Sequence, residues 1–279
     1  METQIKYDCT LKYPILLLHG MGYRDSKVFS YWGRIPGVLR KHGAEVYFGH
    51  QDANADIEKN SQMIAERIRK LTSMTGVPKV NIIAHSKGGL EARYLVSTLG
   101  MKDHIASVTT VNTPHNGSYT IDRILRLPRV IIRFISICTD LWMRITGDRH
   151  CDTYKALHQL STAYAKQFNV NNPDCSDVFY QSFGFKMKSI SSDLVMSFPY
   201  LVVHHFDGDN DGLLSERSVR WTNFHGMYTS PERRGISHVD QVDMRRKKFS
   251  SKPPSGDLEV SDITDFYLKI ADDLRKRGL

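Results

Sequence analysis

Cysteine is scarce in this chain of 279 residues, which contains only Cys9, Cys138, Cys151 and Cys175. Their separations match neither the paired spacing of a zinc-binding motif nor a dense disulfide framework. A small fold held together by disulfides is therefore excluded, and a hydrophobic core must supply the stability. We expect four free thiols, with a single disulfide as the alternative.

Long apolar segments are also absent. The sequence has no apolar run of about 18 residues, the length that a transmembrane helix requires, so we expect no transmembrane segment. Residues 1–6 have neither the apolar core nor the cleavage site of a secretory signal peptide. We therefore expect a cytoplasmic protein, or a secreted one if a leader has been removed.

The chain has no basic arm with interleaved aromatic residues, so we expect no nucleic-acid partner. Its formal net charge is nevertheless +8, with an isoelectric point of about 9.2. This excess indicates either attraction to anionic surfaces such as phospholipid or a solvated surface rich in lysine and arginine. The short basic run at residues 245–248 is interpreted as an exposed loop.

What the sequence does contain is an alternation of apolar runs with segments of helical periodicity. Such alternation predicts one α/β domain over residues 1–279, with a mostly parallel central sheet flanked by helices. The expected strands are 13–18, 45–48, 80–86, 105–111 and 200–206, and the expected helices are 27–41, 55–75, 90–96 and 261–276.

Residues 118–170 interrupt this alternation. The segment is helical in pattern and unusually apolar, and arginines occur along it at intervals. It is predicted to be an insertion over the carboxyl edge of the sheet, where α/β proteins place their sites. We interpret it as a mobile lid with an apolar inner face for acyl chains or a lipid surface. The alternative is a buried helical subdomain.

Ser86 follows a buried apolar run and precedes a helical segment, in the stretch Ala84-His85-Ser86-Lys87-Gly88-Gly89. A serine on a sharp turn between strand and helix, flanked by small residues, is typical of a nucleophile elbow. The usual glycine is present at Gly88 and replaced at Ala84. Ser86 is therefore the candidate nucleophile of an acyl-transfer reaction.

A serine nucleophile needs a histidine base and a carboxylate, and on this scaffold both follow the serine in the order acid, then histidine. His238 is the last histidine of the chain and is the predicted base, with His225 as the competitor. His204 and His205 precede the acidic cluster and break the expected order. That cluster offers three candidate acids, Asp207, Asp209 and Asp211.

The spacing of these aspartates also resembles the start of an EF-hand calcium loop. Such a loop needs a bidentate glutamate at its twelfth position, where this chain has Ser218, so the EF-hand interpretation fails. For the oxyanion hole we expect the backbone N–H of Lys87, which follows the nucleophile. The second donor is expected from Met21, in the glycine-rich turn after the first strand.

Several further motifs support one family. They are Tyr13-Pro14-Ile15-Leu16-Leu17-Leu18-His19-Gly20-Met21, Tyr31-Trp32-Gly33-Arg34-Ile35-Pro36, Val80-Asn81-Ile82-Ile83-Ala84-His85-Ser86, Asn112-Thr113-Pro114-His115-Asn116-Gly117-Ser118, Asn210-Asp211-Gly212-Leu213 and Ser237-His238-Val239-Asp240-Gln241-Val242. With them the chain resembles the bacterial triacylglycerol lipases of the pseudomonad type, in the α/β-hydrolase superfamily. The resemblance covers roughly the first 120 residues and much of the last 75.

The resemblance implies an α/β-hydrolase fold with a helical lid at 118–170 and a triad of Ser86, Asp211 and His238. It selects Asp211 because the family acid stands in an Asn-Asp-Gly-Leu context. It also implies Met21 and Lys87 as oxyanion donors.

The same resemblance implies a structural calcium ion near the histidine, outside the chemistry itself. Asp240 matches one ligand, and Asp193 is the nearest candidate for the other. The segment before the acid departs from the family pattern, and Met244 stands where the family has glutamine.

The function expected from these residues is hydrolysis of carboxylic esters, including acylglycerols, through an acyl-enzyme on Ser86, with no cofactor for the chemistry. The expected partners are an ester or lipid substrate and, transiently, a lipid surface. One alternative is a short-chain carboxylesterase that acts on soluble esters. Another is a catalytically silent protein of the same fold that binds lipid or a partner.

Overall fold

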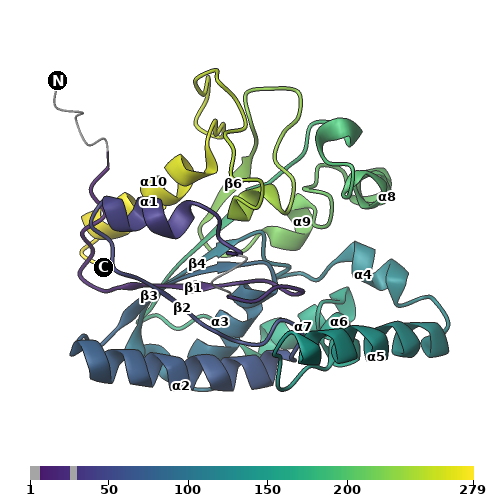
Figure 1. Ribbon diagram of the computed structural model, residues 1–279, viewed down its shortest axis with the longest axis horizontal. Coiled ribbons are helices and arrows are strands. Elements are labelled where there is room, and N and C mark those ends of the chain that lie inside the picture. The colour runs from purple at the N-terminus through teal and green to yellow at the C-terminus, as the bar shows by residue number, and fades with distance from the viewer. Residues whose placement is uncertain (1–6, 26–29) are drawn as a thin grey trace.

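The computed structural model describes residues 7–25 and 30–279, and its centre is a sheet of six parallel strands (Figure 1). The strands lie in the order β2-β1-β3-β4-β5-β6. Their bounds are β1 Ile15–Leu18, β2 Val46–Phe48, β3 Val80–His85, β4 Ile105–Val111, β5 Phe179–Phe185 and β6 Phe224–Tyr228. This arrangement confirms the predicted α/β-hydrolase fold with its parallel sheet. The expectation of no leader concerns residues 1–6, which lie outside the described residues.

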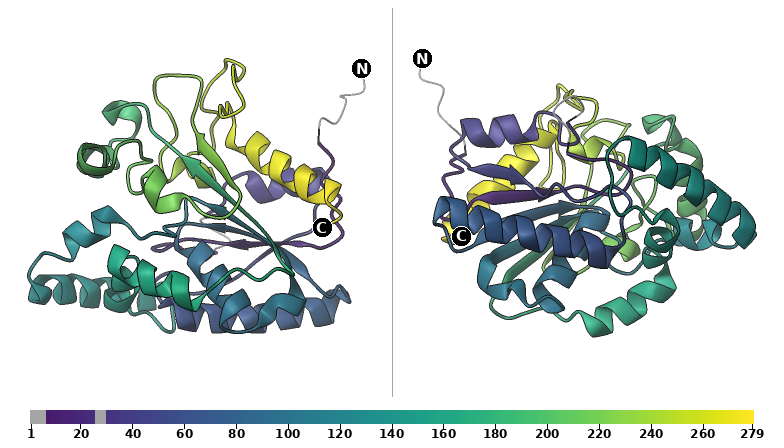
Figure 2. Two further views of the ribbon diagram at one scale, coloured as in Figure 1. Left: turned by 180° about the vertical axis from the view of Figure 1, so that it is seen from behind. Right: turned by 60° about the horizontal axis from the view of Figure 1, so that its bottom comes forward.

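Helices cover both faces of the sheet (Figures 1 and 2). One face carries α1 (Ile35–Lys41) and α10 (Ile263–Lys276), and the other carries α2 (Ile57–Thr75) and α3 (Lys87–Ser97). The shorter helices are α9 (Glu216–Val219) and the 3₁₀ turns η1 (Met101–His104), η2 (Ile190–Ser192) and η3 (Asp240–Val242). The helix predicted over 27–41 begins only at Ile35, whose successor Pro36 suits a first helical turn, and residues 26–29 lie outside the described part.

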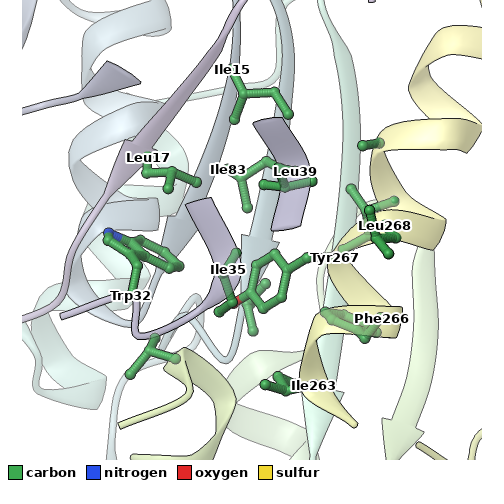
Figure 3. Close-up of a cluster of buried hydrophobic side chains, with 14 of the residues drawn as sticks. Ile15, Leu17, Trp32, Ile35, Leu39, Ile83, Ile263, Phe266, Tyr267 and Leu268 are labelled. Atoms are coloured by element: carbon green, nitrogen blue, oxygen red, sulfur yellow. The ribbon is translucent and has the colours of Figure 1, made fainter. Parts of the chain in front are cut away.

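The core forms as two layers because successive residues of a strand point to opposite faces. Ile15, Leu17 and Ile83 pack with α1 and α10, and Figure 3 shows them beside Trp32, Phe266 and Tyr267. The neighbouring residues Leu16 and Ile82 instead pack with α2 and α3. Both faces of the strands are buried, which explains why the strands appear in the sequence as continuous apolar runs.

The strand predicted over residues 200–206 is wrong. These residues form the helix α8 (Ser197–Asp207), of which only Tyr200 and Val203 are buried, three residues apart on one helical face. A short apolar run does not distinguish a buried strand from a helix. The strands of this part of the sheet are β5 and β6, which the sequence analysis missed because glycine, serine and glutamine interrupt their aromatic residues.

Residues 118–170 are helical as predicted, with α4 (Tyr119–Ile124), α5 (Arg129–Ile145), α6 (Thr153–Gln159) and most of α7 (Thr162–Asn171). These helices and α8 project beyond the same end of the sheet, on opposite sides of it (Figures 1 and 2). Helix α5 buries only Ile132 and Ser136.

Two further findings concern the pairing of the cysteines and the membrane-spanning helices. All four cysteines are unpaired, and Cys9 and Cys151 are buried. No helix in the described part of the chain combines the length and the apolar composition needed to cross a membrane.

Candidate active site

Ser86 occupies the turn between β3 and α3, with φ 53° and ψ −129°. A positive φ is strained for any residue with a side chain, and such strain concentrates at functional sites. The turn is held on both sides, because Ser86 N donates to Val111 O (3.0 Å) and Thr113 Oγ1 donates to Ser86 O (2.8 Å). Ser86 therefore has the strained backbone of a nucleophile elbow.

Two glycines allow the chain to approach this turn closely. A Cβ on Gly88 would lie 2.7 Å from His19 O, and a Cβ on Gly20 would lie 2.9 Å from Ser86 Cβ. The loop after β1 thus packs directly against the elbow, as an oxyanion-hole loop must. Ala84, where the motif departs from glycine, lies fully buried within β3, and its methyl group is accommodated in the core.

His238 and Asp211 are in direct contact. Their Nδ1 and Oδ2 atoms are 2.6 Å apart, and the backbone N–H of His238 donates to Asp211 O at 2.8 Å. Oδ1 of Asp211 accepts from the N–H groups of Leu213 (3.0 Å) and Leu214 (2.8 Å). Burial raises the pKa of Asp211, but His238 and these N–H groups outweigh burial and hold it below its ordinary value. Asp211 is therefore a carboxylate that can orient His238.

The other candidate acids and the competing histidine lie elsewhere. Asp207 accepts from Ser215 Oγ, and Asp209 forms an exposed ion pair with Lys186. His225 stacks on Phe183 beside α10, with ring centroids 4.5 Å apart. Of the three aspartates, only Asp211 bonds to His238. Because α8 precedes it, Asp211 does not follow a strand directly in sequence. The chain nevertheless returns to β5 at this point, since Met187 N donates to Asn210 O (2.8 Å).

Ser86, His238 and Met21 line one cavity of about 540 Å³. Most of its other lining residues are apolar, among them Ile121, Leu160, Val195, Met196, Leu213 and Val242. The side chain of Lys87 is absent from this lining and is buried in an ion pair with Glu91. The cavity therefore joins a polar centre to a wall that suits a hydrocarbon chain.

A hydrogen-bonded chain that the sequence analysis missed connects the two halves of the site. Gly20 N donates to Tyr31 Oη (3.0 Å), and Tyr31 Oη lies 2.6 Å from Nδ1 of His85. Nε2 of His85 lies 3.0 Å from Gln241 Oε1, and Gln241 Nε2 donates to Asp211 Oδ2 (2.7 Å).

The positions of the protons in this series of hydrogen bonds follow from its two ends, the N–H of Gly20 and the carboxylate of Asp211. Burial raises the pKa of Tyr31, so the phenol keeps its proton and donates it to His85 Nδ1. His85 then carries its own proton on Nε2 and donates to Gln241. The loop after β1 and Asp211 are thereby linked by hydrogen bonds that all run in one direction. In the sequence, Tyr31 and His85 stood out only as members of motifs that resemble the family, and nothing in their spacing predicted this contact.

Two buried histidines predict a dependence of stability on pH. Burial lowers the pKa of His85 well below 6.5, with His238 adding to the effect, and burial and Arg93 do the same for His115. Below pH 6.5 the unfolded chain therefore binds more protons than the folded protein. We expect the free energy of unfolding to fall as the pH drops from 7 to 5, by up to about 1.4 kcal/mol per pH unit for each histidine.

Urea denaturation at a series of pH values measures this slope. A His115→Asn variant should show a smaller slope, because one of the two histidines with the strongly lowered pKa is gone. A free energy of unfolding that stays constant between pH 7 and pH 5 would contradict the assignment of both histidines as neutral.

The carboxylates expected to bind calcium are brought together, but each one is paired with arginine. Asp193 Oδ2 and Arg245 Nη2 are 2.6 Å apart, and Asp240 Oδ2 and Arg234 Nη2 are 2.7 Å apart. Within the described ranges, no group of three or more histidine, cysteine, aspartate or glutamate residues could hold a metal ion.

Comparisons with known proteins identify the family and the fold. A family model described as palmitoyl protein thioesterase matches residues 14–183, more than half of the chain. Triacylglycerol lipase 2 of Saccharomyces cerevisiae is 28% identical over 92% of this chain and 76% of its own length. A triacylglycerol lipase of Vibrio cholerae is 30% identical over 75% of this chain and 74% of its own.

Among solved structures, the lipase of Staphylococcus hyicus superposes with a TM-score of 0.67 at 18% identity. The superposition covers 95% of this chain and 96% of that one. This likeness concerns the fold, and the family rests on the sequence matches. The chain therefore belongs to the palmitoyl protein thioesterase family and to the bacterial triacylglycerol lipases, and it is a carboxylic ester hydrolase of the α/β-hydrolase fold.

Proposed function

We propose that the protein hydrolyses acyl esters through Ser86, His238 and Asp211. In the first half of the reaction, Ser86 Oγ attacks the carbonyl carbon while Nε2 of His238 takes the hydroxyl proton. The ester C–O bond then breaks, and the alcohol leaves with that proton. In the second half, water gives a proton to His238 and attacks the acyl-enzyme, which releases the acid and restores Ser86. Asp211 holds Nδ1–H of His238 and stabilises the imidazolium.

Backbone N–H groups of Met21 and Lys87 are proposed to bind the oxyanion. Lys87 is the first residue of α3, and the N–H groups of a first helical turn have no partner within the helix. The loop of Met21 lies against the elbow through the close approach of Gly20. Because the Lys87 ammonium is buried with Glu91, its contribution here is the backbone N–H alone.

One observation carries the proposal: a histidine hydrogen-bonded to a buried carboxylate opens into the same cavity as a strained serine. The test is labelling with a fluorophosphonate probe together with hydrolysis of nitrophenyl esters. We expect stoichiometric labelling of Ser86. Failure to label would instead support a catalytically silent protein of this fold.

Acylglycerols presented at a lipid surface are the proposed substrates, with residues 118–170 as the lid. Helix α5 turns an apolar stripe toward solvent, and its most exposed members recur at helical spacing: Val130, Phe134, Ile137, Leu141, Trp142 and Ile145. Leu194 and Val195, in the turn before α8, and Phe198, in the first turn of α8, are also exposed. Apolar patches of this extent mark interaction sites, and the arginines of α4 and α5 suit an anionic lipid surface.

Removing two aromatic side chains from this surface tests the lipid-surface role. Phe134 is 68% exposed and Trp142 is 61% exposed, so the pair should contribute to interfacial binding and little to folding. We expect a Phe134→Ser/Trp142→Ser variant to hydrolyse emulsified triglyceride at least about tenfold more slowly, since each aromatic contributes about 2 kcal/mol on burial. Hydrolysis of a soluble acetate ester should stay within about twofold.

Met74→Ser is the matched control, because Met74 is equally exposed but lies on α2. Equal losses on both substrates, or no loss on the emulsion, would contradict the role of this surface. The short-chain carboxylesterase alternative predicts a rate that falls steadily with acyl length and does not rise above the solubility limit. A palmitoyl thioester belongs in the same series, because thioesters share the acyl-enzyme route and the matched family model is described by that activity.

A further inference from the structure

The segment that carries His238 is joined to the rest of the site through two buried carboxylates. Asp240 lies two residues after His238, and Asp193 lies on the segment between β5 and α8. Both are almost fully buried. The hydroxyl of Ser237 lies between them, 2.9 Å from Asp193 Oδ2 and 2.9 Å from Asp240 Oδ2. Two negative charges at this separation need a cation or a proton to neutralise them.

Two arginines supply that charge. Arg245 bridges the carboxylates, with Nη2 at 2.6 Å from Asp193 Oδ2 and Nε at 3.3 Å from Asp240 Oδ1. Arg234 lies on the other side, where it donates from Nη2 to Asp240 Oδ2 (2.7 Å) and from Nε to Ser192 O (2.7 Å). Two aspartates thus face two guanidinium groups, and the cluster is neutral without any further ion.

The donors around these oxygens do not fit a calcium ion. Calcium takes six to eight oxygen ligands, which must have free lone pairs. Asp193 Oδ1 already accepts from Val195 N (3.0 Å), and Asp240 Oδ2 accepts from Ser237 N (3.1 Å) as well as from Arg234. Asp193 Oδ2 accepts from Ser237 Oγ and Arg245 Nη2. Asp240 Oδ1 accepts no hydrogen bond from the described residues, but it lies 3.3 Å from Nε of Arg245, whose positive charge occupies the place that a cation would take. An ion with two positive charges would displace these donors and lie beside two arginines.

We infer that Arg245, assisted by Arg234, performs in this chain the structural task for which the family resemblance implied calcium. The planar guanidinium can bridge two carboxylates because its N–H groups diverge in a fixed geometry. It ties the segment before α8 to the 237–245 segment, and through Asp240 it fixes the backbone that presents His238.

The basic run at 245–248 is an exposed loop, as expected. The side chain of Arg245, 39% exposed, nevertheless lies against two buried carboxylates and borders the catalytic cavity. Arg245 is a positioning residue, because it acts on the reaction through the loop of His238. That positioning role depends on the proposed function, whereas the effect on stability does not.

The experiment combines a chelator with two substitutions at Arg245. For the unmodified protein, we expect millimolar EGTA or calcium chloride to leave both the melting temperature and kcat unchanged. Arg245→Ala should lower the melting temperature by roughly 5 °C, since two buried carboxylates lose their shared partner. It should lower kcat on a soluble ester by about tenfold and leave KM within about twofold, since a displaced histidine slows chemistry more than binding. Arg245→Lys should recover part of both losses.

Arg233→Ala is the matched control, because Arg233 is an exposed arginine beside Arg234, and it should behave as the unmodified protein does. A melting temperature that EGTA lowers and calcium restores would overturn the inference. So would an Arg245→Ala variant with an unchanged melting temperature. If Ser86 proves not to be the nucleophile, the melting-temperature results still stand, so the two failures are distinguishable.

Discussion

Replacement of Ser86 by alanine is expected to lower kcat for ester hydrolysis by about 10³- to 10⁶-fold. The substitution removes the hydroxyl proposed to form the acyl-enzyme and leaves the proposed backbone donors of Met21 and Lys87 in place. Residual catalysis from those donors and from substrate binding sets the lower limit of the loss. The fold should not change, because alanine retains the Cβ that the strained turn already accommodates.

The measurement is the rate of nitrophenyl ester hydrolysis by purified protein, together with fluorophosphonate labelling and the melting temperature. Ser73→Ala, an exposed serine on α2, is the matched control and should retain full activity. A Ser86→Ala variant that keeps more than about a tenth of the activity would contradict the role of Ser86.

Replacement of Asp211 by asparagine is expected to lower kcat by about 10⁴-fold, since His238 loses the carboxylate that sets its tautomer. The local hydrogen bonds make this substitution severe. Oδ2 of Asp211 accepts from Gln241 Nε2, from Asn112 Nδ2 and from His238, while Oδ1 accepts from two backbone N–H groups. An amide NH₂ at the Oδ1 position would face two backbone N–H groups that cannot reverse. At the Oδ2 position it would force His238 to give up its proton on Nδ1.

The same clash predicts a loss of stability of about 2 kcal/mol, because at least one buried donor is left without an acceptor. Asp209→Asn and Asp207→Asn are the matched controls, and both should stay within a few-fold of the original kcat. Asp209 in particular forms an exposed pair with Lys186. The reverse ranking of the three variants would move the acid to another aspartate.

The amount of the fold that could be predicted differed between the two halves of the chain. The strands β1, β3 and β4 are buried on both faces, and their continuous apolar runs made them visible in the sequence. The region from β5 to α8 was not predictable in this way. Its strand Phe179–Phe185 contains polar and glycine residues, whereas its helix Ser197–Asp207 contains an apolar run that resembles a strand. Tertiary packing decided both, against the local pattern.

The residues of the candidate site were easier to predict than the secondary structure between β5 and Asp211. Ser86, the acidic cluster and His238 occur in the order that the chemistry requires, and order is a property of the sequence. Residues 187–209 form an excursion after β5 and return beside it, so the misassigned helix did not move the acid. The motif departure at Ala84 had no consequence, because its methyl group points into the core.

By itself, the sequence determined the strained turn at Ser86 and the glycines beside it, since turn geometry depends on the residues in the turn. The residues alone left three neighbouring aspartates open, and only the family context selected Asp211, which the tertiary structure places against His238. Only the tertiary structure decided that Tyr31, His85 and Gln241 connect the loop after β1 to Asp211. It also decided that Arg245 bridges Asp193 and Asp240. These contacts join residues far apart in the chain, and their energies depend on distance and burial, which residue order does not specify.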